Sequence, residues 1–128
     1  MSKPTDSELD ILQVLWDHQP CTVRTIHEIL ANRKEVGYTT TLKQMQRMEE
    51  KGLIMRETIT KGKSILYSAV EKERHIKSRL VDKLKKRVFG NSISELMLHA
   101  IGKDKVSREE LEKIKELINQ LDNNTDNE

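Results

Sequence analysis

Apolar residues over the first 52 positions recur three or four residues apart, the spacing of one face of an α-helix. Thr5 and Glu8 form a capping-box pattern that opens the first of three predicted helices, and Pro20 ends that helix. Thr22 can cap the second helix, and residues 32–37 form a charged turn after it. The three apolar stripes are Leu9, Leu12, Leu15 and Trp16; Val23, Ile26, Ile29 and Leu30; Leu42, Met45 and Met48.

The third helix is expected to begin at Thr39 or Thr40 and to end at Gly52. The period then changes to two short runs of β-branched and apolar residues, 53–59 and 64–70, which predict a hairpin. Its tip, 60–63, has a glycine between two lysines. Three helices followed by a hairpin is the order of a winged helix-turn-helix.

Helical spacing returns after residue 70 in a long helix that ends near Phe89-Gly90. Two further capping boxes, at Ser92 and Ser107, open two more helices. The sequence therefore predicts a mainly α fold with a small antiparallel β wing. We divide it into a winged helix domain (1–71), a C-terminal helical dimerisation domain (72–122) and a disordered tail (123–128).

The last three helices are amphipathic but too short to bury all their apolar faces against one another. Pairing two copies of the chain across a two-fold axis would cover these faces, so we expect a homodimer. The expected interface residues are Leu80, Leu84, Leu96, Ile114, Ile118 and Leu121.

The net charge of +2 hides a division along the chain. Residues 1–90 carry 18 Lys and Arg against 12 Asp and Glu, whereas residues 91–128 carry 5 against 9. A basic first part favours an anionic partner. A single cysteine, Cys21, and the lack of a signal peptide or a membrane-length apolar run favour the cytoplasm.

In a helix-turn-helix, the second helix of the pair lies in the major groove of DNA and its first residues face the bases. The third predicted helix takes this place, the start of the second helix suits a phosphate, and the wing lysines suit the DNA backbone. The expected DNA-binding residues are Thr22, Arg24, Tyr38, Thr39, Thr40, Lys43, Gln46, Arg47, Lys61 and Lys63. Two plainer interpretations stay open: Thr39 as only a helix cap, and Arg47 as only an ion-pair partner of Glu50.

Other chemistry finds little support in the residues. The four histidines are scattered without metal-ligand spacing, and there is no glycine-rich phosphate loop or nucleophile elbow. We therefore expect no enzyme activity, cofactor or metal. Two other functions stay open, a protein-interaction module and a ligand-sensing regulator of the MarR or ArsR type.

The chain also resembles the penicillinase repressor family, the BlaI/MecI/CopY group of bacterial repressors. The similar segments are Thr5–Leu9, Val14–Trp16, Thr22–Arg24, Tyr38–Thr40, Arg47–Leu53, Tyr67–Ser68 and Phe89–Ser92. The resemblance implies a repressor that binds a dyad operator as a homodimer.

The resemblance further implies release of repression by cleavage in the C-terminal region, under control of a membrane-bound sensor metalloprotease. The family's cleaved bond is typically Asn-Phe, and the matching position here reads Val88-Phe89. The copper-responsive branch carries C-terminal cysteines, which this chain lacks.

Overall fold

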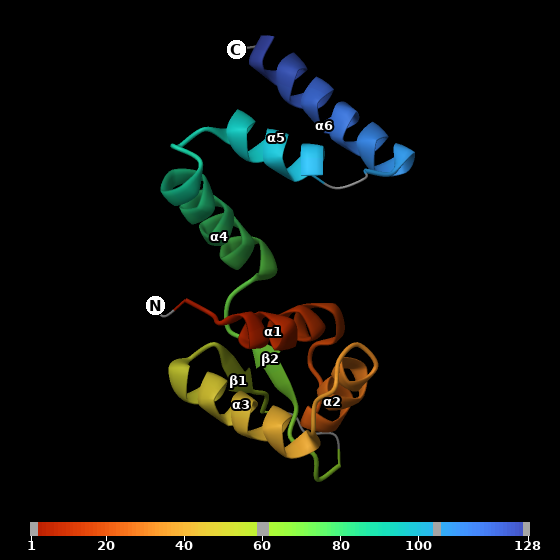
Figure 1. Ribbon diagram of the computed structural model, residues 1–128. Helices are drawn as coiled ribbons and strands as arrows, with labels where there is room; N and C mark the ends of the chain where they lie inside the picture. Colours follow the sequence, from red (N-terminus) through yellow and green to blue (C-terminus); the bar gives the residue numbers. More distant parts are fainter. Residues whose placement is uncertain (1–2, 59–61, 104–105, 127–128) are drawn as a thin grey trace. The chain divides into compact units, whose positions relative to one another are not determined.

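The computed structural model describes residues 3–58, 62–103 and 106–126, and the chain divides into two compact units, Met1–Arg79 and Leu80–Glu128. The first unit contains α1 (Asp6–His18), α2 (Val23–Ala31), α3 (Tyr38–Lys51), β1 (Ile54–Arg56), β2 (Tyr67–Ala69) and the start of α4 (Glu73–Val88). The second unit contains the rest of α4, α5 (Ile93–Lys103) and α6 (Arg108–Asp126) (Figure 1). This mainly helical fold with one small antiparallel sheet confirms the predicted fold class.

Local hydrogen bonds begin the helices where the capping patterns predict. The Glu8 N–H donates to Thr5 Oγ1 (3.2 Å), and the Thr5 N–H donates to Glu8 Oε1 (2.9 Å), which completes a capping box. Three other helices, α2, α5 and α6, begin in a similar way. In each, the hydroxyl oxygen of the capping residue accepts a hydrogen bond from the backbone N–H three residues later, and these capping residues are Thr22, Ser92 and Ser107.

The recognition-helix candidate α3 starts earlier than predicted. Its N-cap is Gly37, so neither Thr39 nor Thr40 caps it and both lie inside the helix. Thr41 is only 1% exposed, and its hydroxyl turns back and donates to the Gly37 carbonyl (3.3 Å). Gly52 ends α3 with a φ of +80°, as expected of a glycine in the left-handed region.

Among the described residues, the two strands of the hairpin are shorter than the runs that predict them. β1 and β2 pair antiparallel, with Ile54 opposite Ala69 and Arg56 opposite Tyr67. Cys21 joins the other edge of β2, since its N–H donates to the Tyr67 carbonyl (3.1 Å) and its carbonyl accepts from the Tyr67 N–H (2.8 Å). The segment between α1 and α2 is thereby fastened to the wing.

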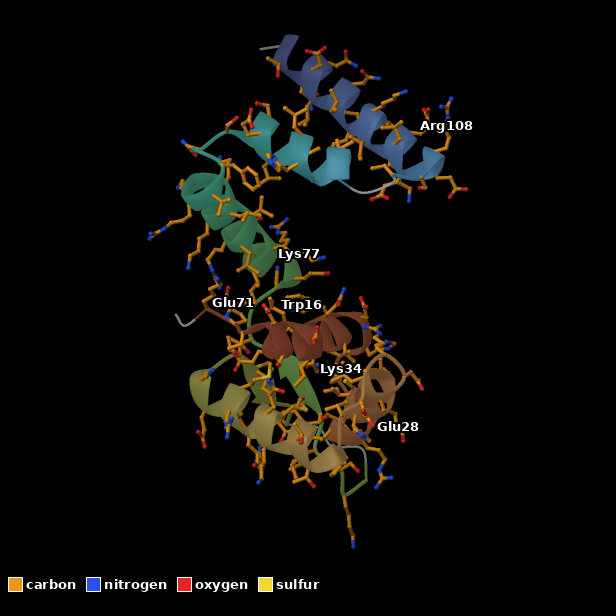
Figure 2. All side chains as sticks on the ribbon, in the orientation of Figure 1. Trp16, Glu28, Lys34, Glu71, Lys77 and Arg108 are labelled. Atoms are coloured by element: carbon orange, nitrogen blue, oxygen red, sulfur yellow. The ribbon has the colours of Figure 1, made fainter. Side chains whose placement is uncertain are left out.

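The core of the described structure lies in the first unit. Ile76, on α4, is only 1% exposed, and the Trp16 indole N–H donates to the Glu71 carbonyl (3.3 Å) (Figure 2). Arg79 forms an ion pair with Glu71. The compact unit therefore extends to Arg79, whereas the sequence places the domain boundary after residue 71. The other large buried side chains include Ile11, Leu12, Leu15, Ile26, Met45, Met48 and Ile54.

A nearly buried carboxylate joins α1 to the end of α3. Glu8 is 3% exposed, and its Oε2 lies 2.9 Å from Lys51 Nζ. Burial by itself would raise the pKa of Glu8. Hydrogen bonds from Thr5 and Lys51, with the charge of Lys51, outweigh burial and lower the pKa below its ordinary value of 4.5.

The second unit has a different character. Of its described side chains, none is buried. Its helix α6 continues to Asp126 and so includes the first four residues of the predicted tail, and the Thr125 hydroxyl donates to the Leu121 carbonyl (2.9 Å). Apolar side chains that stay exposed are Val81, Leu84, Val88, Ile93, Leu98, Leu117, Ile118 and Leu121.

Candidate nucleic-acid interface

One face of α3 presents polar and cationic side chains away from the core. At 100° per residue, five of the six predicted DNA-binding residues on α3 fall within an arc of roughly 120°, while Met45 and Met48 are buried on the opposite side and Tyr38 lies outside the arc. The exposed side chains on this arc are Thr39, Thr40, Lys43, Gln46 and Arg47. Thr41, in the same first turn, is buried, so the threonine pair available to a base is Thr39 and Thr40.

The start of α2 adjoins this face. Thr22 is half-buried, and its hydroxyl oxygen accepts a hydrogen bond from the Thr25 N–H (3.2 Å), which makes it the N-cap of α2. Arg24 is exposed in the first turn of the helix. The Thr22 hydroxyl oxygen already serves as the helix cap, whereas the guanidinium group of Arg24 is available to DNA.

A cleft of about 280 Å³ lies where α2, α3 and the hairpin meet. It brings together four of the predicted DNA-binding residues, Thr22, Arg24, Tyr38 and Lys63. Val23, Leu42, Ser64, Ile65 and Tyr67 complete its lining. Ser64 and Ile65 are not among the predicted contacts, because their position in the cleft follows only from the path of the hairpin. Lys61, the other predicted wing contact, lies outside the described residues.

Four described cations of this surface are unpaired. Within the part of the chain that the structure describes, Arg24, Lys43, Arg47 and Lys63 have no carboxylate within 4.0 Å, so Arg47 does not pair with Glu50. Elsewhere in the first unit several cations are matched. These pairs are Lys34 with Asp10 (2.8 Å), Lys51 with Glu8 (2.9 Å) and Arg56 with Glu49 (2.9 Å). Unpaired cations on one face suit an anionic partner.

The turn between α2 and α3 is held by His27, which is not among the predicted site residues. His27 Nε2 lies 3.1 Å from the Val36 carbonyl, so this nitrogen carries the proton and donates it. The His27 ring also meets the Tyr38 ring edge to face, with centroids 5.6 Å apart. Both contacts help to fix the first residue of α3 beside the cleft.

Other chemistry is not built into the described residues. Cys21 is 6% exposed, and burial raises the pKa of its thiol to about 11, which opposes a redox-sensing role. Across 3–58, 62–103 and 106–126, no three His, Cys, Asp or Glu side chains gather as a metal site. None of the helices in these ranges is long and apolar enough to cross a membrane.

The predicted residues of the second unit are partly exposed. Leu84, Ile118 and Leu121 are 44%, 55% and 57% exposed, and Leu80, Leu96 and Ile114 are half-buried. The Val88-Phe89 bond lies at the end of α4. The Val88 side chain is exposed, but the Phe89 N–H donates to the Lys85 carbonyl (3.2 Å) and its ring contacts His99.

Sequence comparison gives a match over nearly the whole chain. The profile of the family described as Penicillinase repressor matches residues 4–120. The protein named Transcriptional regulator BlaI from Mycobacterium tuberculosis, strain H37Rv, is 25% identical over 119 residues, which cover 91% of this chain and 83% of that protein.

Comparison with solved structures gives winged-helix regulators. The C30AH42A mutant of ZitR from Lactococcus lactis has a TM-score of 0.54 at 22% identity, covering 97% of this chain and 77% of that one. The PcaV transcriptional regulator from Streptomyces coelicolor has a TM-score of 0.51 at 14% identity, covering 95% and 77%. At these identities the likeness concerns the fold alone.

Proposed function

Because the chain belongs to the penicillinase repressor family of transcriptional regulators, we propose that it represses transcription by binding a dyad operator in double-stranded DNA as a homodimer. The observation that carries the proposal is the exposed face of α3, where Thr39, Thr40 and unpaired Lys43 lie at the start of the helix. Threonine and lysine at this position suit base edges and phosphates in the major groove.

The second unit supports the homodimer. Helices with no buried side chain among those described cannot form a core of their own, so their apolar residues need a partner surface. An open apolar hollow of about 410 Å³ along α5, lined by Met97, Leu98 and Ile101 among others, belongs to this surface. A second copy would place two recognition helices about 34 Å apart, or a multiple of that, on one side of the DNA.

We further propose that cleavage at Val88-Phe89, under control of a membrane-bound sensor metalloprotease, releases repression. A cut at this bond would separate α4 from α5 and α6, and so divide the proposed dimer surface. The hydrogen bond of the Phe89 N–H and the contact of its ring with His99 must open before a protease can hold the bond in an extended form. Intact repressor after induction in cells would contradict this step.

The test of DNA binding is a gel-shift titration with the DNA upstream of the gene that encodes this chain. We expect a complex that prefers this DNA to a shuffled sequence and weakens steeply with salt. Thr40→Ala should reduce the preference between sequences, because Thr40 faces the groove. Lys113→Ala, an exposed change on α6, is the matched control. A complex with no sequence preference would refute the operator proposal.

A further inference from the structure

The cleft between α2, α3 and the hairpin has a composition that points to one particular part of the DNA. We propose that it holds a single phosphodiester group of the operator backbone, bound at once by Arg24 and Lys63. The inference rests on the proposed function and adds to it which cations share one phosphate.

The charged residues of the cleft come from two separate elements. Arg24 lies on the first turn of α2 and Lys63 lies in the hairpin, 39 positions later in the chain. Both side chains are exposed, and neither has a carboxylate partner in the described chain. No Asp or Glu lines the cleft, so its two positive charges are uncompensated. One anionic group between them would satisfy both.

The rest of the lining favours a phosphodiester over an isolated inorganic anion. Val23, Leu42 and Ile65 give the cleft apolar walls, which a strongly hydrated free ion would not need. A backbone phosphate arrives with apolar deoxyribose carbons on both sides, and these can contact such walls. Tyr38 also lines the cleft and carries a hydroxyl group that can donate a hydrogen bond, and its ring packs edge to face against the His27 ring.

The proposal makes a specific prediction for salt dependence. When two cations neutralise the same phosphate, the double variant Arg24→Ala/Lys63→Ala should reduce the slope of log K against log salt by about 0.9 for each half-site. Cations on separate phosphates would reduce it by about 1.8 for each half-site. Each single variant should weaken operator binding, on the order of 10-fold.

The decisive experiment is operator DNA in which one phosphate per half-site is replaced by a neutral methylphosphonate, scanned along the backbone. We expect one position at which Arg24→Ala and Lys63→Ala both lose their effect on affinity. Lys43→Ala is the matched control, because Lys43 does not line the cleft, and it should keep its effect on that DNA. Thermal unfolding of each variant verifies that the fold is intact.

The outcomes separate this inference from the proposed function. If Arg24 and Lys63 respond to two different methylphosphonate positions, or the double variant loses about 1.8 in slope per half-site, the shared phosphate is refuted while operator binding stands. If inorganic phosphate at low millimolar concentration displaces the DNA from the parent but not from the double variant, the cleft takes a free anion and the inference is likewise refuted. If the parent shows no salt-sensitive binding to any operator DNA, the proposed function fails as well.

Discussion

Ile118 provides the sharpest test of the proposed homodimer. It lies on α6 in the second unit, and 55% of it is exposed. Complete burial of an isoleucine side chain contributes about 1.5–3 kcal/mol, so roughly half of that remains available to a partner. A two-fold interface uses each residue twice, and alanine keeps one methyl carbon. We therefore expect Ile118→Ala to weaken the dimer by about 1–2.5 kcal/mol, a roughly 5- to 60-fold rise in its dissociation constant.

Sedimentation equilibrium over a concentration series measures this constant directly. Asn119→Ala is the matched control, because residue 119 lies roughly 130° from the centre of the apolar stripe on the same helix. It should leave the dissociation constant unchanged. A parent chain that sediments as a monomer at micromolar concentration would contradict the dimer itself. An unchanged constant for Ile118→Ala would instead remove this face of α6 from the interface.

Three further predictions concern the first unit. Glu8→Gln should lower the free energy of unfolding at pH 7 by roughly 1–3 kcal/mol, because the hydrogen-bonded ion pair with Lys51 is lost. Since the pKa of Glu8 is lowered on folding, its contribution is present above about pH 4.5 and disappears as the pH falls through the folded pKa, so urea titrations of parent and variant should converge in acid. Cys21, with a pKa of about 11, should react with a thiol reagent at pH 8 on the order of 100-fold more slowly in the native than in the unfolded chain, and comparable rates would contradict its burial. Ile76→Ala should destabilise the winged helix unit by about 2–5 kcal/mol, although Ile76 lies beyond residue 71, and thermal unfolding without that loss would place Ile76 outside this core.

Short-range signals account for the features that could be predicted. Thr5 with Glu8, Ser92 and Ser107 mark helix starts correctly because a cap joins residues only three positions apart. The three helical stripes and the hairpin follow for the same reason, since their periods are properties of the local backbone. The start of α3 was misplaced because Gly37 and Thr41, rather than a threonine cap, form its first turn.

The candidate site divides in the same way. Its exposed residues on α3 follow from helical periodicity once Met45 and Met48 are assigned to the core. The cleft, by contrast, depends on Arg24 and Lys63 lying close together in the fold. The residues next to each of them in the sequence give no sign of this proximity. The missing ion pairs of these cations are equally a matter of which carboxylates the fold brings near.

By itself the amino-acid sequence determined the order of the elements, most of the helix starts and the polar face of the third helix. These depend on interactions within about four residues, whose geometry the backbone imposes. Only the tertiary structure decided that Cys21 pairs with β2, that Trp16 and Ile76 draw the start of α4 into the first unit, and that two distant cations share a cleft. Each depends on contacts between distant parts of the chain, which exist only after the core has packed.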